Sequence, residues 1–367
     1  THRRQRQMCI RDRPHVDPRP LAFLLGELKL DGGKMNLADP LLPRSVPVED
    51  KEMFHALDVA CAKTRSKRST SLTDIRGPFS QALDAFLKDN IEKYDLVVTH
   101  NPIFQPAVSA VRSAKENGVP VIMIPHAHLD DDFYHFPDVH RAIMDADLVL
   151  AAPKACCDFY EEKGAKVHYL PAGIDCKEHF SEEDVANFKQ VLPIEKPFVL
   201  VLGRKAGAKV YLTVIEAVEQ ISGEIDLHLV MIGPDDDGVP VSSRNASYLG
   251  SQPRSVVRGA LKSCIALVNM SSSESFGIVL LEAWLAGKPV IVNRKCSAFH
   301  DLATHDKNAL MSHDVESLKA ALEQLWTDSE LRDRLAASGR KLAAQFDWSE
   351  IGARFLESSS GLIESCI

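Results

Sequence analysis

The chain has 367 residues, 45% of them hydrophobic and 26% charged, and a formal net charge of −8. At roughly 100–200 residues per domain this length suggests two domains, and the ordinary composition excludes wholesale disorder. No apolar run approaches the roughly 18 residues of a membrane span, and the negative charge argues against a nucleic-acid-binding protein. We therefore expect a soluble, cytoplasmic enzyme.

The charge is unevenly distributed along the chain. Residues 1–13 hold five Arg and one Asp, a balance of +4, so residues 14–367 carry −12. Such a stretch is typical of a disordered basic arm, a transit peptide or foreign sequence. We interpret residues 1–13 as a non-native artefact, and because the chain opens on Thr1 we expect a fragment with a truncated N-terminal domain.

β-Rich runs alternate with helical patterns in the first half, which indicates βαβ units and a parallel sheet. Between residues 20 and 90 only Leu21–Leu25 is a clear strand. The later strands are predicted at Asp95–Thr99, Val119–Ile124, Leu148–Ala151 and Val167–Leu170. The helices between them are predicted at Pro106–Asn117, Val139–Ala146 and Pro153–Lys163.

A second alternating series follows a turn-rich segment at Pro171–Asp175. Its strands are predicted at Phe198–Leu202, Leu227–Ile232, Ile265–Asn269 and Pro289–Asn293. Its helices are predicted at Asp184–Val191, Val210–Ile221, Pro253–Ser263 and Gly277–Ala286, with three more at Val315–Thr327, Ser329–Phe346 and Ser349–Leu362. The pattern predicts an α/β protein with two Rossmann-like domains facing across a cleft.

The predicted domain limits follow from this pattern. Residues 14–175 are predicted to form an N-terminal domain that is incomplete, and residues 176–347 a C-terminal domain. Residues 348–367 form a C-terminal helix that packs back toward the first domain.

The most informative motif runs from Ser271 to Val290, directly after a predicted strand. Gly277 permits close approach of a ligand, and the helix that it opens offers N–H groups and a positive dipole end to a phosphate. Glu274 stays on the loop, whereas Glu282 lies in the helix. The structural alternative is that Glu274 caps the helix and Glu282 faces solvent.

A second strand-to-helix turn carries Gly203, Arg204 and Lys209. Two cations beside a glycine suit a diphosphate, because the glycine lets it approach and the cations supply charge. Alone, this pattern would also fit ordinary surface charge.

Together the two motifs resemble retaining nucleotide-sugar glycosyltransferases of the GT-B fold, of the glycosyl transferases group 1 type. The resemblance lies in two Glu with seven residues between them, followed by Ala286, Gly287, one further residue and Pro289-Val290. It implies that Glu274 contacts the donor sugar hydroxyls and Glu282 the ribose. It also implies a donor-binding loop at Phe276, Gly277 and Ile278, with Gly203, Arg204 and Lys209 on the donor phosphates.

Two departures from the family pattern are visible. Val210 stands where a glycine commonly follows the lysine. The N-terminal Gly-Gly loop of the family is matched only by Gly32-Gly33, which Pro40 and Pro43 separate from any helix.

Histidines and aspartates follow the strand that ends at Ile124. By the resemblance His128, rather than His126, contacts the donor sugar near the reacting carbon. The aspartates at 130–132 could belong to a metal site, but a run of Asp fits a D-x-D pattern trivially, and we expect no metal. We interpret the aspartates at 235–237 as a solvated turn, and place Asn101-Pro102 on the acceptor side.

The resulting hypothesis is a retaining, metal-independent transferase of hexosyl type, with no cofactor and a UDP- or GDP-sugar as donor. The acceptor is a glycan, a lipid or a small molecule, nucleic acid is excluded, and contact with the inner face of the membrane stays open. The alternatives are a nucleotide-sugar epimerase of the GT-B fold and an inactive donor-binding domain.

Overall fold

The computed structural model describes residues 80–129 and 132–364, and assigns four short strands before them. These strands are β1 (Met8–Ile10), β2 (Leu21–Phe23), β3 (Lys29–Leu30) and β4 (Gly33–Lys34). Asp130, Asp131, Gly32 and most of residues 1–13 lie outside the described residues, and so do the expectations that rest on them.

The first unit is a parallel sheet of four strands in the order β5-β6-β7-β8. The strands are β5 (Val97–His100), β6 (Val121–Ile124), β7 (Leu148–Ala151) and β8 (Val167–Tyr169). The connecting helices are α3 (Gln105–Glu116), α4 (Pro137–Met144) and α5 (Lys154–Glu161). Every residue of β6 and β7 is buried, as expected for strands covered on both faces.

One helix of this unit was not predicted from the sequence. α2 (Gln81–Asn90) begins where the Ser80 side chain accepts a hydrogen bond from the N–H of Leu83 at 3.1 Å. It packs on α3, and Leu87 lies against the core of the unit.

The second unit is a parallel sheet of six strands in the order β11-β10-β9-β12-β13-β14. Four of its strands were predicted: β9 (Phe198–Leu202), β10 (His228–Ile232), β12 (Ala266–Asn269) and β13 (Val290–Asn293). The two edge strands, β11 (Ala246–Tyr248) and β14 (Ala309–Ser312), were not. The order reverses between β9 and β12, and ligands of open α/β sheets bind at such a switch point.

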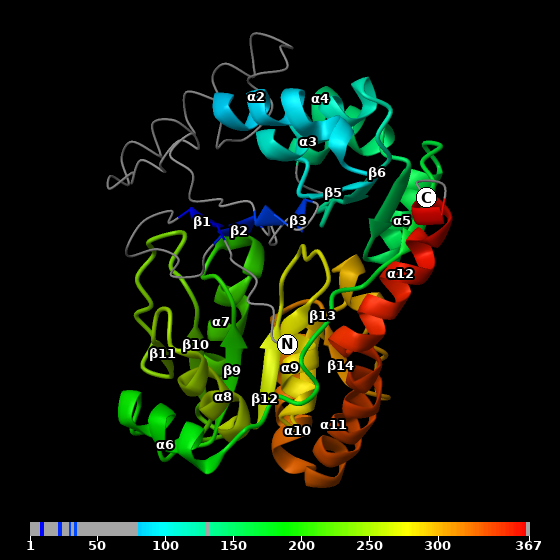
Figure 1. Cartoon of the computed structure of the whole chain (residues 1–367). Helices are drawn as coiled ribbons and strands as arrows, with labels where there is room; N and C mark the ends of the chain where they lie inside the picture. Colours follow the sequence, from blue (N-terminus) through cyan, green and yellow to red (C-terminus); the bar gives the residue numbers. More distant parts are fainter. Residues whose placement is uncertain are drawn as a thin grey trace.

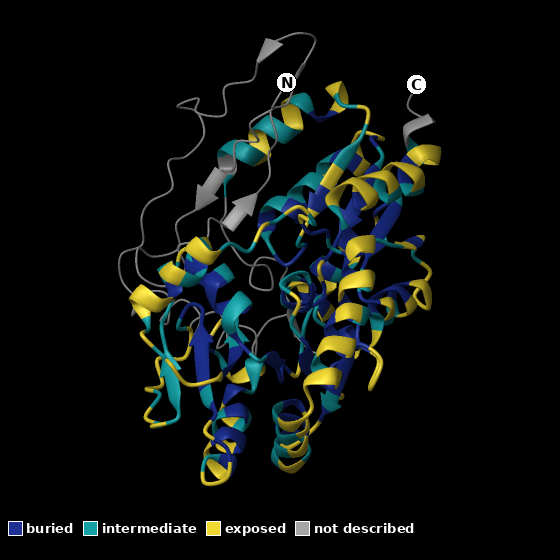
Figure 2. Cartoon of the chain, turned by 90° about the horizontal axis from the view of Figure 1, so that it is seen from below, coloured by how far each residue is buried: buried dark blue, intermediate teal, exposed yellow. Residues whose placement is uncertain are grey.

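Helices cover both faces of this sheet. They are α6 (Glu182–Val191), α7 (Tyr211–Ile221), α8 (Arg254–Ser263), α9 (Ile278–Leu285), α10 (Val315–Thr327) and α11 (Ser329–Ala343). Side chains alternate between the faces along a strand, so Val199 joins one core cluster and Leu200 the other. Figure 2 shows the buried strands inside and the exposed outer surfaces of the helices.

The last helix connects the two units. α12 (Trp348–Glu364) begins in the second unit and runs along one side of the molecule to the first (Figure 1). Its Phe355 and Leu362 pack against buried residues of β6 and β7. Among the described residues, none of the helices has the length and apolar character needed to cross a membrane.

Candidate active site

The two predicted motifs meet at the switch point of the second sheet. Gly203 follows β9 and the loop at 270–277 follows β12, so both lie at the carboxyl ends of neighbouring strands. Gly203 donates its N–H to the carbonyl of Ile232 at 2.9 Å. A Cβ on Gly233 would lie 1.8 Å from the carbonyl oxygen of Gly203, so this approach requires a glycine.

An ion pair joins the two motifs. Lys209 Nζ lies 2.5 Å from Glu274 Oε1, and both side chains are at least four-fifths buried, with 20% and 14% exposed. Asn269 Nδ2 donates to the same oxygen at 3.3 Å. The loops also touch through the backbone, because Ser272 donates its N–H to the carbonyl of Ala208 at 2.9 Å. The structure therefore brings together two residues that lie 65 positions apart in the sequence.

Amide side chains at the strand ends hold the Glu274 loop. Asn269 Oδ1 accepts from the N–H and the hydroxyl of Ser271 at 3.1 and 2.6 Å. Asn293, at the end of β13, donates through Nδ2 to the carbonyls of Met270 and Ser271 at 3.1 and 3.2 Å. Since all four of these residues are buried, the loop has a fixed path below Glu274.

The loop leads into α9 through Gly277, whose φ of +100° favours glycine. The Phe276 side chain is buried and packs on Phe346, so only its backbone is available to a ligand. Ile278, the first residue of α9, is 41% exposed. The N-terminus of α9 thus lies directly after the loop that carries Glu274.

Glu282 lies on α9 and pairs with Arg254, which sequence reasoning missed. Its Oε1 is 2.8 Å from a guanidinium nitrogen of Arg254, whose Nε also donates to Glu178 at 2.7 Å. Burial raises the pKa of Glu282, although Arg254 acts in the opposite direction. The contact of Glu282 with a ribose stays a prediction.

The aspartates at 235–237 lie in a largely exposed loop, in line with the predicted solvated turn, but their carboxylates are also paired. Asp236 pairs with Arg204 at 3.1 Å, while Asp235 and Asp237 both bind the ammonium group of Lys205. Lys205 is 2% exposed, and the sequence analysis assigned it no role. A lysine in a turn is normally solvated, so only the structure shows that Lys205 is buried and paired.

Residues of the first unit face this site. His128 Nδ1 lies 3.0 Å from the hydroxyl of Ser273, on the loop before Glu274. Two residues away, the ring of His126 stacks on that of His100, with their nitrogens 3.2 Å apart. Asn101, expected on the acceptor side, has a left-handed φ of +52° and donates its N–H to the carbonyl of Ile124.

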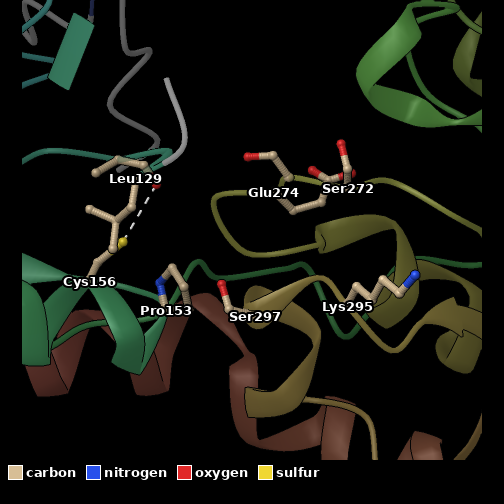
Figure 3. Close-up of a pocket in the computed structure, with 9 residues that line it drawn as sticks. Leu129, Pro153, Cys156, Ser272, Glu274, Lys295 and Ser297 are labelled. Atoms are coloured by element: carbon tan, nitrogen blue, oxygen red, sulfur yellow. Dashed lines mark hydrogen bonds between the residues drawn. The ribbon is translucent and has the colours of Figure 1, made fainter. Parts of the chain in front are cut away.

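Both units line a pocket of about 320 Å³. Figure 3 shows Leu129, Pro153 and Cys156 on one side of it and Ser272, Glu274, Lys295 and Ser297 on the other. Beside it, Asp301 accepts a hydrogen bond from the N–H of Lys154 at 2.8 Å, at the start of α5. Within residues 80–129 and 132–364 no group of three His, Cys, Asp or Glu side chains is placed to hold a metal ion.

Comparison with known proteins agrees with this geometry. Residues 182–342 match the family Glycosyl transferases group 1. The chain is 34% identical over 168 residues to a phosphatidyl-myo-inositol mannosyltransferase of Propionibacterium freudenreichii, covering 43% of this chain and 42% of that protein. It is 31% identical over 175 residues to the lipopolysaccharide core biosynthesis glycosyltransferase LpsE of Rhizobium meliloti, covering 45% and 50%. The chain thus spans about half the length, or less, of these curated relatives.

Solved structures share the fold. HepE of Anabaena, crystallised with UDP and glucose, matches with a TM-score of 0.65 and 19% identity, over 77% of this chain and 81% of that one. A sucrose-phosphate synthase of Thermosynechococcus elongatus matches with a TM-score of 0.65 and 16% identity, over 90% and 87%. The fold is GT-B, which confirms the prediction of two Rossmann-like units.

Proposed function

We propose that the chain is a retaining glycosyltransferase, which moves a hexose from a nucleotide sugar to an acceptor hydroxyl without a metal ion. The observation that carries this proposal is the meeting of Lys209 and Glu274 at the switch point of the second sheet. One supplies charge for a diphosphate, and the other supplies a carboxylate for sugar hydroxyls.

Negative charge grows on the diphosphate as it leaves the sugar, and preorganised positive groups lower the barrier to this step. Arg204, Lys209 and the N-terminus of α9 are the groups that we assign to it. The helix end contributes because its dipole is equivalent to roughly half a positive charge. These groups replace the charge that a metal would otherwise supply.

The reacting sugar would lie between the units. Glu274 receives its hydroxyl groups, and His128 approaches from the first unit, where it already contacts Ser273. Glu282 would accept from the ribose, held in place by Arg254. We assign residues 176–347 to the donor side and residues 14–175 to the acceptor side.

The identity of the donor is proposed from the relatives. The curated relatives include mannosyltransferases, one of them named as GDP-mannose-dependent, whereas HepE was crystallised with UDP-glucose. A UDP- or GDP-hexose is therefore the donor class that we propose. The acceptor is a glycan, a lipid or a small molecule bearing a free hydroxyl.

The test begins with thermal unfolding in the presence of UDP, GDP, UDP-glucose and GDP-mannose, because a ligand that binds only the folded state raises its stability. The donor that raises Tm is then incubated with candidate acceptors and with EDTA, and the anomeric configuration of the product is read by NMR. We expect retention and full activity in EDTA. An inverted product or loss of activity in EDTA would contradict the mechanism, and epimerised donor without an acceptor would favour an isomerase.

A matched pair of variants tests the site itself. Glu274→Gln should lower kcat/KM by about 100-fold or more, since it removes a charge at the reacting sugar. It should not weaken UDP or GDP binding, because Glu274 also pairs with Lys209 and its loss frees that cation. Glu183→Gln, at an exposed position of α6, is the control and should change neither quantity.

A further inference from the structure

The most buried charge beside the proposed donor site is the ammonium group of Lys205, whose side chain is 1% exposed. It lies between Arg204 and Lys209 in sequence, but its side chain is buried, whereas that of Arg204 is 53% exposed. A buried ammonium is expensive unless it is fully paired. The burial of Lys205 must therefore be compensated by the groups that its ammonium binds.

Lys205 is surrounded by acceptors from a single loop. Its Nζ is 2.8 Å from Asp235 Oδ1 and 2.8 Å from the carbonyl of Val239, and it also binds Asp237. The rings of Tyr211 and Tyr248 each lie with their centroids 5.5 Å from it. Although desolvation acts in the opposite direction, the two carboxylates raise the pKa of Lys205 above its ordinary value, so it is charged at neutral pH.

Backbone bonds connect the same two segments. Lys205 donates its N–H to the carbonyl of Pro234 at 2.8 Å, and accepts from the N–H of Asp236 at 3.0 Å. The parallel pairing of β9 and β10 therefore continues past the carboxyl ends of the two strands, at Lys205 and Asp235. Neighbouring side chains of an extended chain point to opposite sides, so burial of Lys205 turns Arg204 outward, where it is 53% exposed.

The contacts around Lys205 also extend to the segment that carries Lys209. The Tyr211 hydroxyl donates to Asp237 Oδ2 at 2.8 Å, and Tyr211 opens α7 two residues after Lys209. The Tyr248 hydroxyl donates to the carbonyl of Gly233 at 2.7 Å. One ammonium thus ties the turn after β9, the loop after β10 and the start of α7.

We propose that Lys205 is a positioning residue for the nucleoside diphosphate: it fixes the turn from Gly203 to Lys209 so that Arg204 and Lys209 reach the two phosphates together. This inference rests on the proposed function, because it concerns the diphosphate of the same donor. It assigns the loop at 235–239 a role in nucleotide binding through Lys205.

The experiment compares Lys205→Met, a close match in length without the charge, with Lys196→Met. Lys196 forms an exposed pair with Asp226 outside this loop. We expect Lys205→Met to raise the Kd of UDP or GDP, measured by calorimetry, by about tenfold or more. In Lys205→Met we also expect amide hydrogen exchange at residues 203–209 to become faster than in the wild type. Exchange at residues 271–277 should stay unchanged. Lys196→Met should change neither.

A triple variant separates positioning from stability. Lys205→Met combined with Asp235→Asn and Asp237→Asn removes the unpaired carboxylates, and should recover much of the Tm lost in the single variant. If the triple variant also binds the nucleotide as tightly as the wild type, the role of Lys205 is purely structural and the inference is overturned. A wild type that binds neither UDP nor GDP would instead overturn the proposed function, and this inference with it.

Discussion

Both cations that we assign to the donor diphosphate are already paired with a carboxylate. Arg204 pairs with Asp236 and Lys209 with Glu274. Glu274 has a proposed role on the sugar, but Asp236 has none. A diphosphate that approaches Arg204 must therefore compete with Asp236 for the guanidinium group.

Removal of this competitor should strengthen nucleotide binding. We expect Asp236→Asn to lower the Kd of UDP or GDP by up to about fivefold, because an exposed ion pair contributes about 0.2–1 kcal/mol. Titration calorimetry at two salt concentrations measures it, with Asp226→Asn, which breaks the remote pair with Lys196, as the control. Weaker binding in Asp236→Asn would mean that the pair orients Arg204 rather than competes for it.

Val210 bears on the same turn through its backbone. Its φ of +51° and ψ of +32° are left-handed, which is a genuine outlier for a β-branched residue. The sequence comparison with the family suggested a glycine here, and the geometry gives the physical reason. A left-handed backbone costs a non-glycine residue about 1–2 kcal/mol.

Relief of this strain is measurable against a matched substitution. Val185, in α6, is also half-buried but belongs to an ordinary right-handed helix. The free energy of unfolding in urea should change about 1–2 kcal/mol more favourably for Val210→Gly than for Val185→Gly. Equal changes in the two variants would show that Val210 carries no strain.

At the scale of elements, the position of the site depends on how α11 packs on α9. A Cβ on Gly339 of α11 would lie 2.1 Å from Cδ1 of Trp284 on α9. The Trp284 side chain is fully buried and donates its indole N–H to the carbonyl of Asn308 at 3.1 Å. This contact therefore fixes the position of α9 against the sheet. Because α9 also carries Glu282, the contact positions that side chain as well.

The same substitution should have opposite signs at two helical glycines. Gly339→Ala should destabilise the protein by about 1–3 kcal/mol, through overpacking against Trp284. Gly352→Ala, in α12, meets nothing within 4 Å and should stabilise by up to about 1 kcal/mol, since alanine favours the helix. Urea denaturation measures both, and a stabilising Gly339→Ala would contradict the packing.

Sequence reasoning was most successful for elements that are long or fully buried. β6 and β7 were predicted because a continuous apolar run needs no partner to be recognised. β11 was missed as a strand because Ala246–Tyr248 contains no apolar run, and β14 because its apolar run, Ala309–Met311, is only three residues long. α2 was missed although five of its ten residues are apolar, and the structure shows that it packs on α3.

The site shows the same division. Lys209 and Glu274 were predictable together because each follows a strand at the same edge of one sheet. The pairing of Lys205 with Asp235 and Asp237 was not, since it depends on the register between two turns beyond the strand ends. Arg254 was also missed, because no spacing along the chain links it to Glu282.

At the scale of the whole molecule, the contacts that join the units among the described residues include three that differ in kind. His128 meets Ser273, Asp301 accepts from the N–H of Lys154, and α12 crosses to pack Phe355 on the first sheet. The first two contacts are polar, and Asp301 also hydrogen-bonds the side chain of Tyr169, whereas the third buries apolar side chains. We therefore infer that α12 does most to hold the first unit against the donor side.

This inference predicts that acceptor-dependent turnover can be lost without loss of nucleotide binding. Phe355→Asp places a charge against Ile122, Ile124, Leu148 and Leu150, and should detach α12 from the first sheet. Gly203, Arg204 and Lys209, which we propose to bind the donor diphosphate, lie in the second unit. The Kd of UDP or GDP should therefore stay within about twofold while kcat falls about tenfold or more.

The neighbouring Leu356→Asp is the control, because Leu356 is 60% exposed and faces away from this contact. Small-angle scattering should show a larger radius of gyration for Phe355→Asp alone. If Phe355→Asp weakened nucleotide binding as much as turnover, the two units would have to be coupled through the donor site itself, and α12 would not be the element that separates their roles.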